Sequence, residues 1–398
     1  MRSRIPMLAM LAGAIALGCG SAEVATPESP DAAVPVANAP NGSYRCDGEH
    51  VQLLDATGRW VDAGDCALDG GTGSALHWNG AEPSAGSAVL LGEPGTSQHR
   101  ILAGSRNDAW FVSGRRVVWT EHAMLFHWDG TWWTELYDWE RFAPSGVVSD
   151  PAGGVWVFGG RQSFTGLGTY VTVASIAHVA PARDRWEEAL PPQIGTGGHV
   201  VDMHAASDGT VWAVGQRAVH GDGVVVRRTA AKWAEMPFSG GVPTSVWAVS
   251  ASDAWVTTSG LGVFHWDGAA WTNTWSVRYE TSPGRLTGFG WLTNGFHWNG
   301  TTWVPPDPTF PVAYDVAYLR PFAVSAGWPG PPELLGIFGR GTSARTYSEV
   351  WSYDGMQWTK DTSPFASFIE RTGGILTAVA GTAPDDDLWI APVTAYAP

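Results

Sequence analysis

One short phrase recurs along the chain, and it constrains the fold more than any other feature of the sequence. Its five copies are HWNG at 77–80, HWDGTWW at 127–133, HWDGAAW at 265–271, HWNGTTW at 297–303 and SYDGMQW at 352–358. Asn-Gly and Asp-Gly accept the positive φ angles that a tight type I′ turn requires at both central residues. Each copy therefore predicts a hairpin, and degenerate copies stand at Arg185-Trp186 and Lys232-Trp233.

A second phrase precedes most copies of the first. It combines polar turn residues with an alternating run that contains Trp, and this pattern is typical of a strand entered through a tight turn. Its copies are NDAWFVSG at 107–114, GGVWVFGG at 153–160, DGTVWAVG at 208–215, SDAWVTTSG at 252–260 and DDDLWIAP at 385–392. The two phrases together describe a unit of several antiparallel strands.

The spacing of the repeats favours one fold class. The Trp residues that close the units stand 32 to 55 residues apart, at 133, 186, 233, 271, 303 and 358. The average interval of 45 residues is the length of a four-stranded propeller blade. An α-solenoid would need long amphipathic helices, a β-helix repeats at about half this length, and a sandwich would not repeat its phrases. We therefore predict an all-β chain that forms a β-propeller.

The two ends of the repeat region complement each other. The first copy, at 75–80, lacks the AW phrase before it, and the last AW phrase, at 388–391, has no HW phrase after it. Joining them makes one blade from both termini and leaves no open sheet edge in the ring. Counting that shared blade predicts seven blades. Six remain the alternative if residues 274–303, the shortest interval, form an incomplete blade.

These phrases resemble the Trp-rich β-propeller repeats of secreted and lipidated bacterial proteins. That family pairs an Asp-Val-Trp-Ala-Val-Gly strand with a His-Trp-Asp-Gly-x-x-Trp hairpin, and the resemblance covers residues 75–398. The stretch VWVFGG at 155–160 looks like one kelch-type blade. Within the family the repeats mark the fold and do not fix an activity.

The amino terminus predicts export and a lipid anchor. Arg2 and Arg4 precede an apolar stretch from Ile5 to Leu17, which is typical of a signal peptide at residues 1–18 and too short for a membrane span. The following Gly18-Cys19 resembles the lipobox of bacterial lipoproteins, which implies a lipidated Cys19; ordinary cleavage without a lipid is the alternative. Gly20, in place of Asp, implies an outer-membrane lipoprotein facing the periplasm or the cell surface.

Three further segments complete the predicted domain organisation. Residues 19–44 are rich in Ala and Pro and are expected to be a disordered tether. Residues 45–70 read as a hairpin flanked by Cys46 and Cys66, which would form a disulfide in an oxidising compartment. Two free thiols are the alternative there. The propeller occupies residues 71–398.

We expect structural roles for the His residues of the repeats. His77, His127, His265 and His297 stand beside acidic or amide residues, but each belongs to a different blade. We therefore expect each His to hydrogen-bond within its own blade. The sequence has no HExxH, paired CxxC or calcium-loop motif, so we expect neither a metal nor another cofactor.

Two classes of function remain open at this point. The net charge of −15 argues against nucleic-acid binding, because that needs a basic face. We expect a non-enzymatic binding or scaffolding module for protein or glycan, with membrane contact through the lipid alone. The alternative is a propeller hydrolase or lyase acting on extracellular polysaccharide, although Asp-box and nucleophile-elbow motifs are absent from the sequence.

Sixteen Trp residues fall on repeat positions and are expected to pack between sheets, whereas Trp139, Trp275 and Trp328 are expected in loops. The longest irregular inserts, predicted to form the recognition face, are 134–146, 161–172 and 304–333. Exposed loop aromatics can stack on sugars or anchor a protein partner. The predicted ligand-binding residues are Trp139, Arg141, Tyr170 and Trp328.

Overall fold

The computed structural model describes residues between 43 and 393, with gaps of which the longest are 66–73, 79–88, 91–98, 276–284, 311–333 and 368–374. The chain divides into two units, residues 1–38 and 39–398, and the first lies entirely outside the described residues. The predicted signal peptide, Cys19 and most of the predicted tether therefore lie outside the described part of the chain, as do Cys66 and Trp328.

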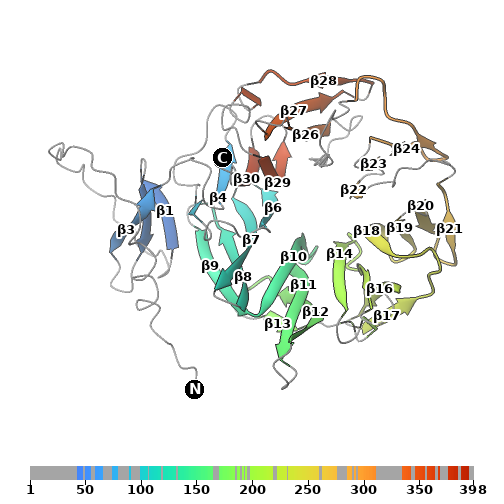
Figure 1. Ribbon diagram of the computed structural model, residues 1–398, viewed down its shortest axis with the longest axis horizontal. Coiled ribbons are helices and arrows are strands. Elements are labelled where there is room, and N and C mark those ends of the chain that lie inside the picture. The colour runs from blue at the N-terminus through green and yellow to red at the C-terminus, as the bar shows by residue number, and fades with distance from the viewer. Residues whose placement is uncertain are drawn as a thin grey trace. The chain divides into compact units, whose positions relative to one another are not determined.

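The described strands form seven antiparallel sheets, most of them with four strands in chain order (Figure 1). The first sheet has the order β3-β2-β1-β9-β8-β7-β6. Its strands are β1 (Ser43–Asp47), β2 (His50–Leu54), β3 (Trp60–Asp65), β6 (His99–Ser105), β7 (Asp108–Val117), β8 (Thr120–Trp128) and β9 (Trp133–Glu140).

The next three sheets each contain four consecutive strands. The β10–β13 sheet contains β10 (Phe142–Ser149), β11 (Val155–Phe164), β12 (Tyr170–Val179) and β13 (Trp186–Glu188). The β14–β17 sheet contains β14 (His199–Ala205), β15 (Val211–Gln216), β16 (Gly223–Thr229) and β17 (Lys232–Met236). The β18–β21 sheet contains β18 (Pro243–Ser250), β19 (Asp253–Thr258), β20 (Gly262–Trp266) and β21 (Trp271–Asn273).

The last three sheets have shorter or less complete strands. Four short strands form the β22–β25 sheet: β22 (Leu286–Gly288), β23 (Trp291–Leu292), β24 (His297–Trp298) and β25 (Trp303–Val304). Three form the next sheet: β26 (Leu334–Gly341), β27 (Thr346–Tyr353) and β28 (Trp358–Lys360). The final sheet has the order β29-β30-β4-β5 and contains β29 (Ile375–Ala383), β30 (Asp387–Val393), β4 (Ser74–Trp78) and β5 (Val89–Leu90).

Where both repeated phrases occur in one sheet, they occupy the same register. The Trp of the AW phrase, on the second strand, pairs with the His of the HW phrase on the third, as in Trp110↔His127 and Trp255↔His265. The same register joins Trp389 of β30 to His77 of β4, so strands from opposite ends of the described chain share one sheet. Up-and-down sheets of this kind are the blade units of propeller folds.

Consecutive sheets pack through their faces. The first strand of each lies against the preceding sheet: β10 contacts β6, β7 and β8, β14 contacts β10 and β11, and β18 contacts β14 and β15. Likewise β22 contacts β18 and β19, β26 and β27 contact β29, and β29 contacts β6. Trp291, Phe310 and Trp358 form a buried cluster between the β22–β25 sheet and the following sheet. Among the described residues, the hydrophobic core is therefore a series of layers between neighbouring sheets, from the first sheet to the β26–β28 sheet.

The segment 45–70 contains the predicted antiparallel hairpin, and β1 extends it by pairing with β9 through Ser43↔Thr134 and Tyr44↔Trp133. Cys46 lies in β1, but Cys66 lies outside the described residues, so the disulfide stays a prediction.

The prediction of an irregular insert at 134–146 is wrong. These residues belong almost entirely to β9 and β10, with only Arg141 between the two strands. Much of 161–172 is likewise strand, because β11 continues to Phe164 and β12 begins at Tyr170. Of 304–333, residues 304–310 are described and the remainder lies outside the described part.

Candidate functional site

Two of the repeated His residues, His127 and His265, have hydrogen-bond partners within their own sheets, as the sequence predicted. His127 Nε2 lies 2.7 Å from Asp108 Oδ1, and His265 Nε2 lies 2.9 Å from Asp253 Oδ1. The His265 ring stacks on Trp255 at 4.1 Å between centroids. Burial lowers the pKa of His127 below its ordinary value, the opposing effect of the Asp108 hydrogen bond being smaller. These residues hold strands together and are not candidates for a ligand site.

His178 has the same role, although no HW phrase marks it in the sequence. Its Nε2 lies 2.6 Å from Asp150 Oδ2, and its ring stacks on Trp156 at 4.0 Å between centroids. Its equivalence to the other His residues is seen in the strand register, because Trp156 pairs with His178 as Trp110 pairs with His127.

The closing Trp of each unit normally packs on the aromatic residue that ends the third strand. The ring centroids of Trp266 and Trp271 are 5.5 Å apart, those of Trp298 and Trp303 are 5.6 Å apart, and Tyr353 and Trp358 are 5.3 Å apart. In the β10–β13 sheet the third strand ends in Val179, which pairs with the closing Trp186. Trp186 therefore has no aromatic partner of this kind.

Trp186 contacts the neighbouring sheet instead. Its ring packs edge-to-face on Trp139 of β9, with centroids 5.7 Å apart and planes at 83°. The side chain is left 39% exposed, whereas Trp133, Trp303 and Trp358 at the equivalent position are buried. The expectation that every closing Trp is enclosed between sheets is therefore wrong for Trp186. Val179 stands at the position where Trp128, Trp298 and Tyr353 contact the buried Trp133, Trp303 and Trp358.

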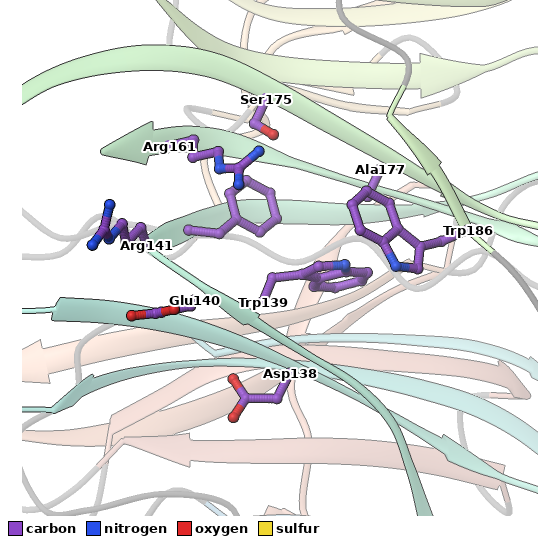
Figure 2. A pocket seen from close by; sticks show the side chains of 9 residues that line it. Asp138, Trp139, Glu140, Arg141, Arg161, Ser175, Ala177 and Trp186 are labelled. Atoms are coloured by element: carbon purple, nitrogen blue, oxygen red, sulfur yellow. The ribbon is translucent and has the colours of Figure 1, made fainter. Parts of the chain in front are cut away.

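A cavity of about 430 Å³ opens beside this pair of Trp residues, between β9 and the face of the β10–β13 sheet (Figure 2). Its lining comes from five consecutive strands and the residue between β9 and β10: Asp138, Trp139, Glu140, Arg141, Phe142, Arg161, Ser175, Ala177 and Trp186. We call this cavity the inter-sheet groove. Its volume is in the range of small-molecule binding sites.

Strand alternation decides which side chains face the groove. Successive side chains on a strand point to opposite faces. Tyr137 and Trp139 share one face of β9, where their rings stack at 5.4 Å, and Trp139 packs edge-on against Phe142. Asp138 and Glu140 are exposed, and Figure 2 shows Asp138 directed away from the two indoles. The aromatic face of β9 is therefore the face that lines the groove.

On the other side, β11 and β12 supply small and polar residues. Their register pairs Arg161 with Val173, Gly159 with Ser175 and Val157 with Ala177. Ser175 and Ala177 are buried and occupy little volume, which leaves the space that the groove fills. Figure 2 shows Arg161 and Ser175 toward one end of the groove and Ala177 and Trp186 toward the other.

The link between the two sheets is a single residue in a left-handed conformation. Arg141 has a φ of 66° and stands between β9 and β10. This conformation is uncommon for residues other than glycine. It turns the chain from one sheet into the next within one residue, so Trp139 and Phe142 line the same groove.

Two of the four predicted ligand-binding residues line the groove. Trp139 and Arg141 are among the lining residues, although Trp139 is buried in a strand and not exposed in a loop. Tyr170 begins β12 and pairs with Phe164, and Trp328 lies outside the described residues. Trp275 packs on Phe296 and Trp303, as a partly buried core residue.

Trp186 and Ser175 are not among the residues predicted for ligand binding, and Arg161 is included only as the first residue of the predicted insert 161–172. Trp186 was assigned to the repeat, and the signal of its departure is Val179 at a position where four other units have Trp or Tyr and the β14–β17 sheet has Arg228. Ser175 becomes a candidate only through the register of β11 and β12, which brings its side chain to the same face as Arg161.

A separate polar cluster connects the first strands of three sheets. The backbone N–H of Val246 donates to Asp202 Oδ2 at 3.1 Å, and that of Ala248 donates to His204 Nδ1 at 3.2 Å. The N–H of Leu286 donates to Ser245 Oγ at 2.7 Å. Burial lowers the pKa of His204 to about 4 and raises that of Asp202, the latter against the opposing charge of Arg285. These side chains satisfy backbone donors between sheets, which is a structural role.

In the part of the chain that the structure describes, no three His, Cys, Asp or Glu side chains gather as a metal site would require. Within the same residues, no helix has the length and apolar character needed to cross a membrane.

Comparison with known proteins gives structural likenesses at low identity. No family model matches the chain, and no curated protein matches it. The structure of YCF48 bound to D1 peptide is 12% identical, with 89% of this chain and 92% of that chain covered at a TM-score of 0.36. The C-terminal WD40 domain of Sif2 is 8% identical, covering 75% of this chain and 96% of that chain at a TM-score of 0.39.

TolB from Acinetobacter baumannii is 10% identical, with 88% of this chain and 78% of that chain covered at a TM-score of 0.34. At these identities and TM-scores, the likenesses say nothing about what this chain binds.

Proposed function

We propose that the chain is a non-enzymatic binding module of the bacterial cell envelope, and that its ligand occupies the inter-sheet groove. The observation that carries this proposal is Trp186, a repeat residue that packs across the groove on Trp139 and stays 39% exposed. A large aromatic side chain at the mouth of a cavity gives much contact area at little entropic cost. At the equivalent position Trp133, Trp303 and Trp358 are buried, and Trp233 and Trp271 are partly buried.

The proposal includes a closed propeller of seven blades. Support comes from the packing of each sheet on the next and from the pairing of β30 with β4, which uses both ends of the described chain. The interval 274–303, which would be incomplete in a six-bladed ring, contributes the four strands of the β22–β25 sheet. A closed ring would hold β9 and the β10–β13 sheet rigidly and so preserve the groove.

The position of the carboxylates favours binding over hydrolysis. A glycoside hydrolase needs two carboxyl groups on either side of the scissile bond, about 5–10 Å apart. Asp138 and Glu140 are the acidic residues of the lining, and they lie on the face of β9 opposite to Trp139. Strand alternation therefore directs both carboxylates away from the face of β9 that carries Trp139.

The location is proposed from the sequence alone. Lipidation at Cys19 would anchor the chain in the outer membrane, and residues 19–44 would serve as the tether. Metabolic labelling with palmitate tests this: label should enter the wild type and be absent from the Cys19→Ser variant. If the variant still fractionated with the outer membrane, the anchor would be excluded.

Binding is tested with the full chain on an envelope extract and a glycan array. Trp186→Ala should lose the retained component, because it removes the exposed ring and leaves the buried core intact. Met356→Ala is the matched control, since Met356 is 78% exposed at a hairpin turn of another sheet. Equal retention by all three proteins would show that the groove is not the binding site.

A further inference from the structure

We infer that Asn299 is a site of spontaneous covalent modification, at which the side-chain amide is lost as ammonia and the residue becomes aspartate or isoaspartate. Asn299 lies in the hairpin turn between β24 and β25, in a different sheet from the inter-sheet groove. The inference therefore goes beyond the proposed binding function and does not depend on it. Its basis is the geometry of the turn and the chemistry of an Asn-Gly pair.

The turn holds the side chain of Asn299 in one place. Asn299 Oδ1 accepts hydrogen bonds from the backbone N–H groups of Thr301 at 3.0 Å and of Thr302 at 2.9 Å. The N–H of Asn299 in turn donates to the carbonyl of Thr302 at 3.2 Å. Gly300 has a φ of 95°, a left-handed conformation that glycine adopts without steric cost. The side-chain carbonyl is thus fixed at the turn, with Gly300 as the next residue.

This arrangement favours attack of the Gly300 peptide nitrogen on Cγ of Asn299. The new bond closes a five-membered ring, the nitrogen gives up its proton, and negative charge develops on Oδ1. Two N–H groups already donate to that oxygen, as donors do to the oxyanion in enzymatic acyl transfer. The bond from Cγ to Nδ2 then breaks and ammonia leaves. Water opens the resulting cyclic imide at either carbonyl, which gives aspartate or isoaspartate.

Both reactants are accessible. Asn299, Gly300 and Thr301 are exposed. No atom from elsewhere in the chain lies within 4 Å of the position that a side chain on Gly300 would take. Nothing therefore hinders the attacking nitrogen, and water can reach the ring that it forms.

The same dipeptide at 294–295 provides an internal comparison. The N–H of Gly295 donates to the carbonyl of Leu292 at 2.9 Å. Gly295 is also buried, and the ring of Phe310 lies 2.7 Å from the position that a Cβ would take. A peptide nitrogen whose proton is held in a buried hydrogen bond is poorly placed to attack a neighbouring amide. The two Asn-Gly pairs should therefore differ in reactivity, although their sequence is the same.

The equivalent turns of other sheets carry aspartate, which indicates that the turn accepts the product. Hydrogen bonds from the N–H groups of Ala270 and Ala269 lower the pKa of Asp267. The pKa of Asp354 is lowered in the same way by two N–H groups of its own turn. An ionised carboxylate is a poor electrophile, so these residues should resist the ring closure that the neutral amide of Asn299 undergoes. The aspartate product at position 299 would keep the same hydrogen bonds and add a negative charge.

Peptide mapping of the full chain by mass spectrometry tests the inference. Folded protein and protein unfolded in urea are incubated at the same mildly alkaline pH, and the acid formed at each Asn-Gly pair is followed with time. In the folded protein, Asn299 should react about tenfold or more faster than Asn294, because two donors stabilise its oxyanion and the nitrogen of Gly295 is held. In urea the two rates should converge. Asn299 should react at least as fast in the folded protein as in urea.

Three variants connect the reaction with the turn. Asp267→Asn places the dipeptide in an equivalent turn, in which Gly268 has the same φ of 95° as Gly300. This variant should gain a second reactive site, at position 267, with a rate like that of Asn299. Asn299→Gln is the matched control and should stay unmodified, since its longer side chain has to close a six-membered ring. Asn299→Asp should unfold at the same urea concentration as the wild type, because the turn donors bind a carboxylate at Asp267.

Several results would overturn the inference. Slower conversion of Asn299 in the folded protein than in urea would show that the turn does not promote the reaction. An equal ratio of the Asn299 and Asn294 rates in both conditions would show that the fold does not choose between them. An Asp267→Asn variant that stays unmodified at position 267, or an Asn299→Asp variant that unfolds earlier than the wild type, would contradict the role given to the turn. None of these results bears on the inter-sheet groove, so the proposed function is tested separately.

Discussion

The two faces of the β10–β13 sheet are built from the same strands, yet one layer is filled and the other is open. On the face toward the β14–β17 sheet, Phe158 and Ile176 pack on Val200 and Met203, and Ile194 completes the layer at 2% exposure. On the face toward β9, the layer ends at Ala177 and Ser175, and the inter-sheet groove follows.

The difference lies in a residue that the repeat does not contain. Ile194 comes from the segment between β13 and β14, where its N–H donates to the carbonyl of Pro191 at 3.2 Å. The layer against β9 has no counterpart, because β9 and β10 are joined by Arg141 alone. A short link thus leaves space between sheets, and a longer segment supplies a side chain to fill it.

The largest effect that would test this comparison is expected from Trp139→Ala. Trp139 is 8% exposed and belongs to the hydrophobic cluster between the two sheets. Removing a buried Trp side chain typically lowers the free energy of unfolding by about 3–5 kcal/mol. Guanidinium unfolding measures the change, and Trp139→Phe should recover most of it. A loss below about 1 kcal/mol would mean that Trp139 is not part of the core.

Ile194→Ala tests the filled layer. The change opens a cavity against Phe158 and Ile176 and should lower the free energy of unfolding by about 2–4 kcal/mol. Binding in the inter-sheet groove should not change, because Ile194 lies on the opposite face of the β10–β13 sheet. Urea unfolding and calorimetry on the same preparation check both expectations. Lost binding with intact stability would contradict the separation of the two layers.

Burial of His204 between the β14–β17 and β18–β21 sheets should make the free energy of unfolding depend on pH. Its pKa is about 4 in the folded protein and about 6.5 when unfolded, so protons favour the unfolded state as the pH falls through this range. The protein should lose roughly 3 kcal/mol from this residue between pH 6.5 and pH 4. Asp202, whose pKa is raised, acts in the opposite direction, since its contribution to stability is lost as the pH rises.

The effect of His204 is therefore measured as the difference in unfolding free energy between the wild type and a variant that lacks this side chain. Unfolding of the wild type and of His204→Gln is followed from pH 7 to pH 4, with binding measured in parallel. The variant should lose less stability on acidification than the wild type. Identical pH profiles would show that His204 is not a buried, uncharged acceptor for the N–H of Ala248.

The smallest change in stability is expected from Trp186→Ala. At 39% exposure this side chain contributes less than an enclosed Trp, so we expect a loss of about 1 kcal/mol or less in the free energy of unfolding. Trp303→Ala, at the equivalent but buried position, should cost several times as much. Thermal unfolding of the two variants measures the ratio, and equal losses would contradict the distinction between them.

Much of the strand arrangement could be predicted from the sequence, because the turn dipeptides and the repeated phrases mark individual strands. Asp-Gly and Asn-Gly turns locate hairpins, and the paired phrases lead to Trp110↔His127 and Trp255↔His265. The prediction failed at 134–146 because charged residues of β9 lie on its exposed face, so that the segment looks like a loop. Its apolar face becomes visible only when Tyr137 and Trp139 are placed against the next sheet.

The groove was harder to predict, because it arises where two sheets meet. Trp139 and Arg141 were identified from their residue types, although Trp139 for the wrong environment. Trp186 looked like any closing Trp, and its exposure follows from Val179 on another strand and Trp139 on another sheet. Such a site is the space left between two neighbouring sheets. A sequence pattern within one strand does not predict that space.

The claim that the open layer is the binding site can be tested most directly by filling it. Ser175 is buried on the floor of the inter-sheet groove, and a cavity of about 430 Å³ has room for a larger side chain there. Calorimetric titration of Ser175→Leu with the ligand that the wild type binds should show binding lost, while the free energy of unfolding stays the same or rises. Full affinity in a stable, folded Ser175→Leu variant would contradict the account.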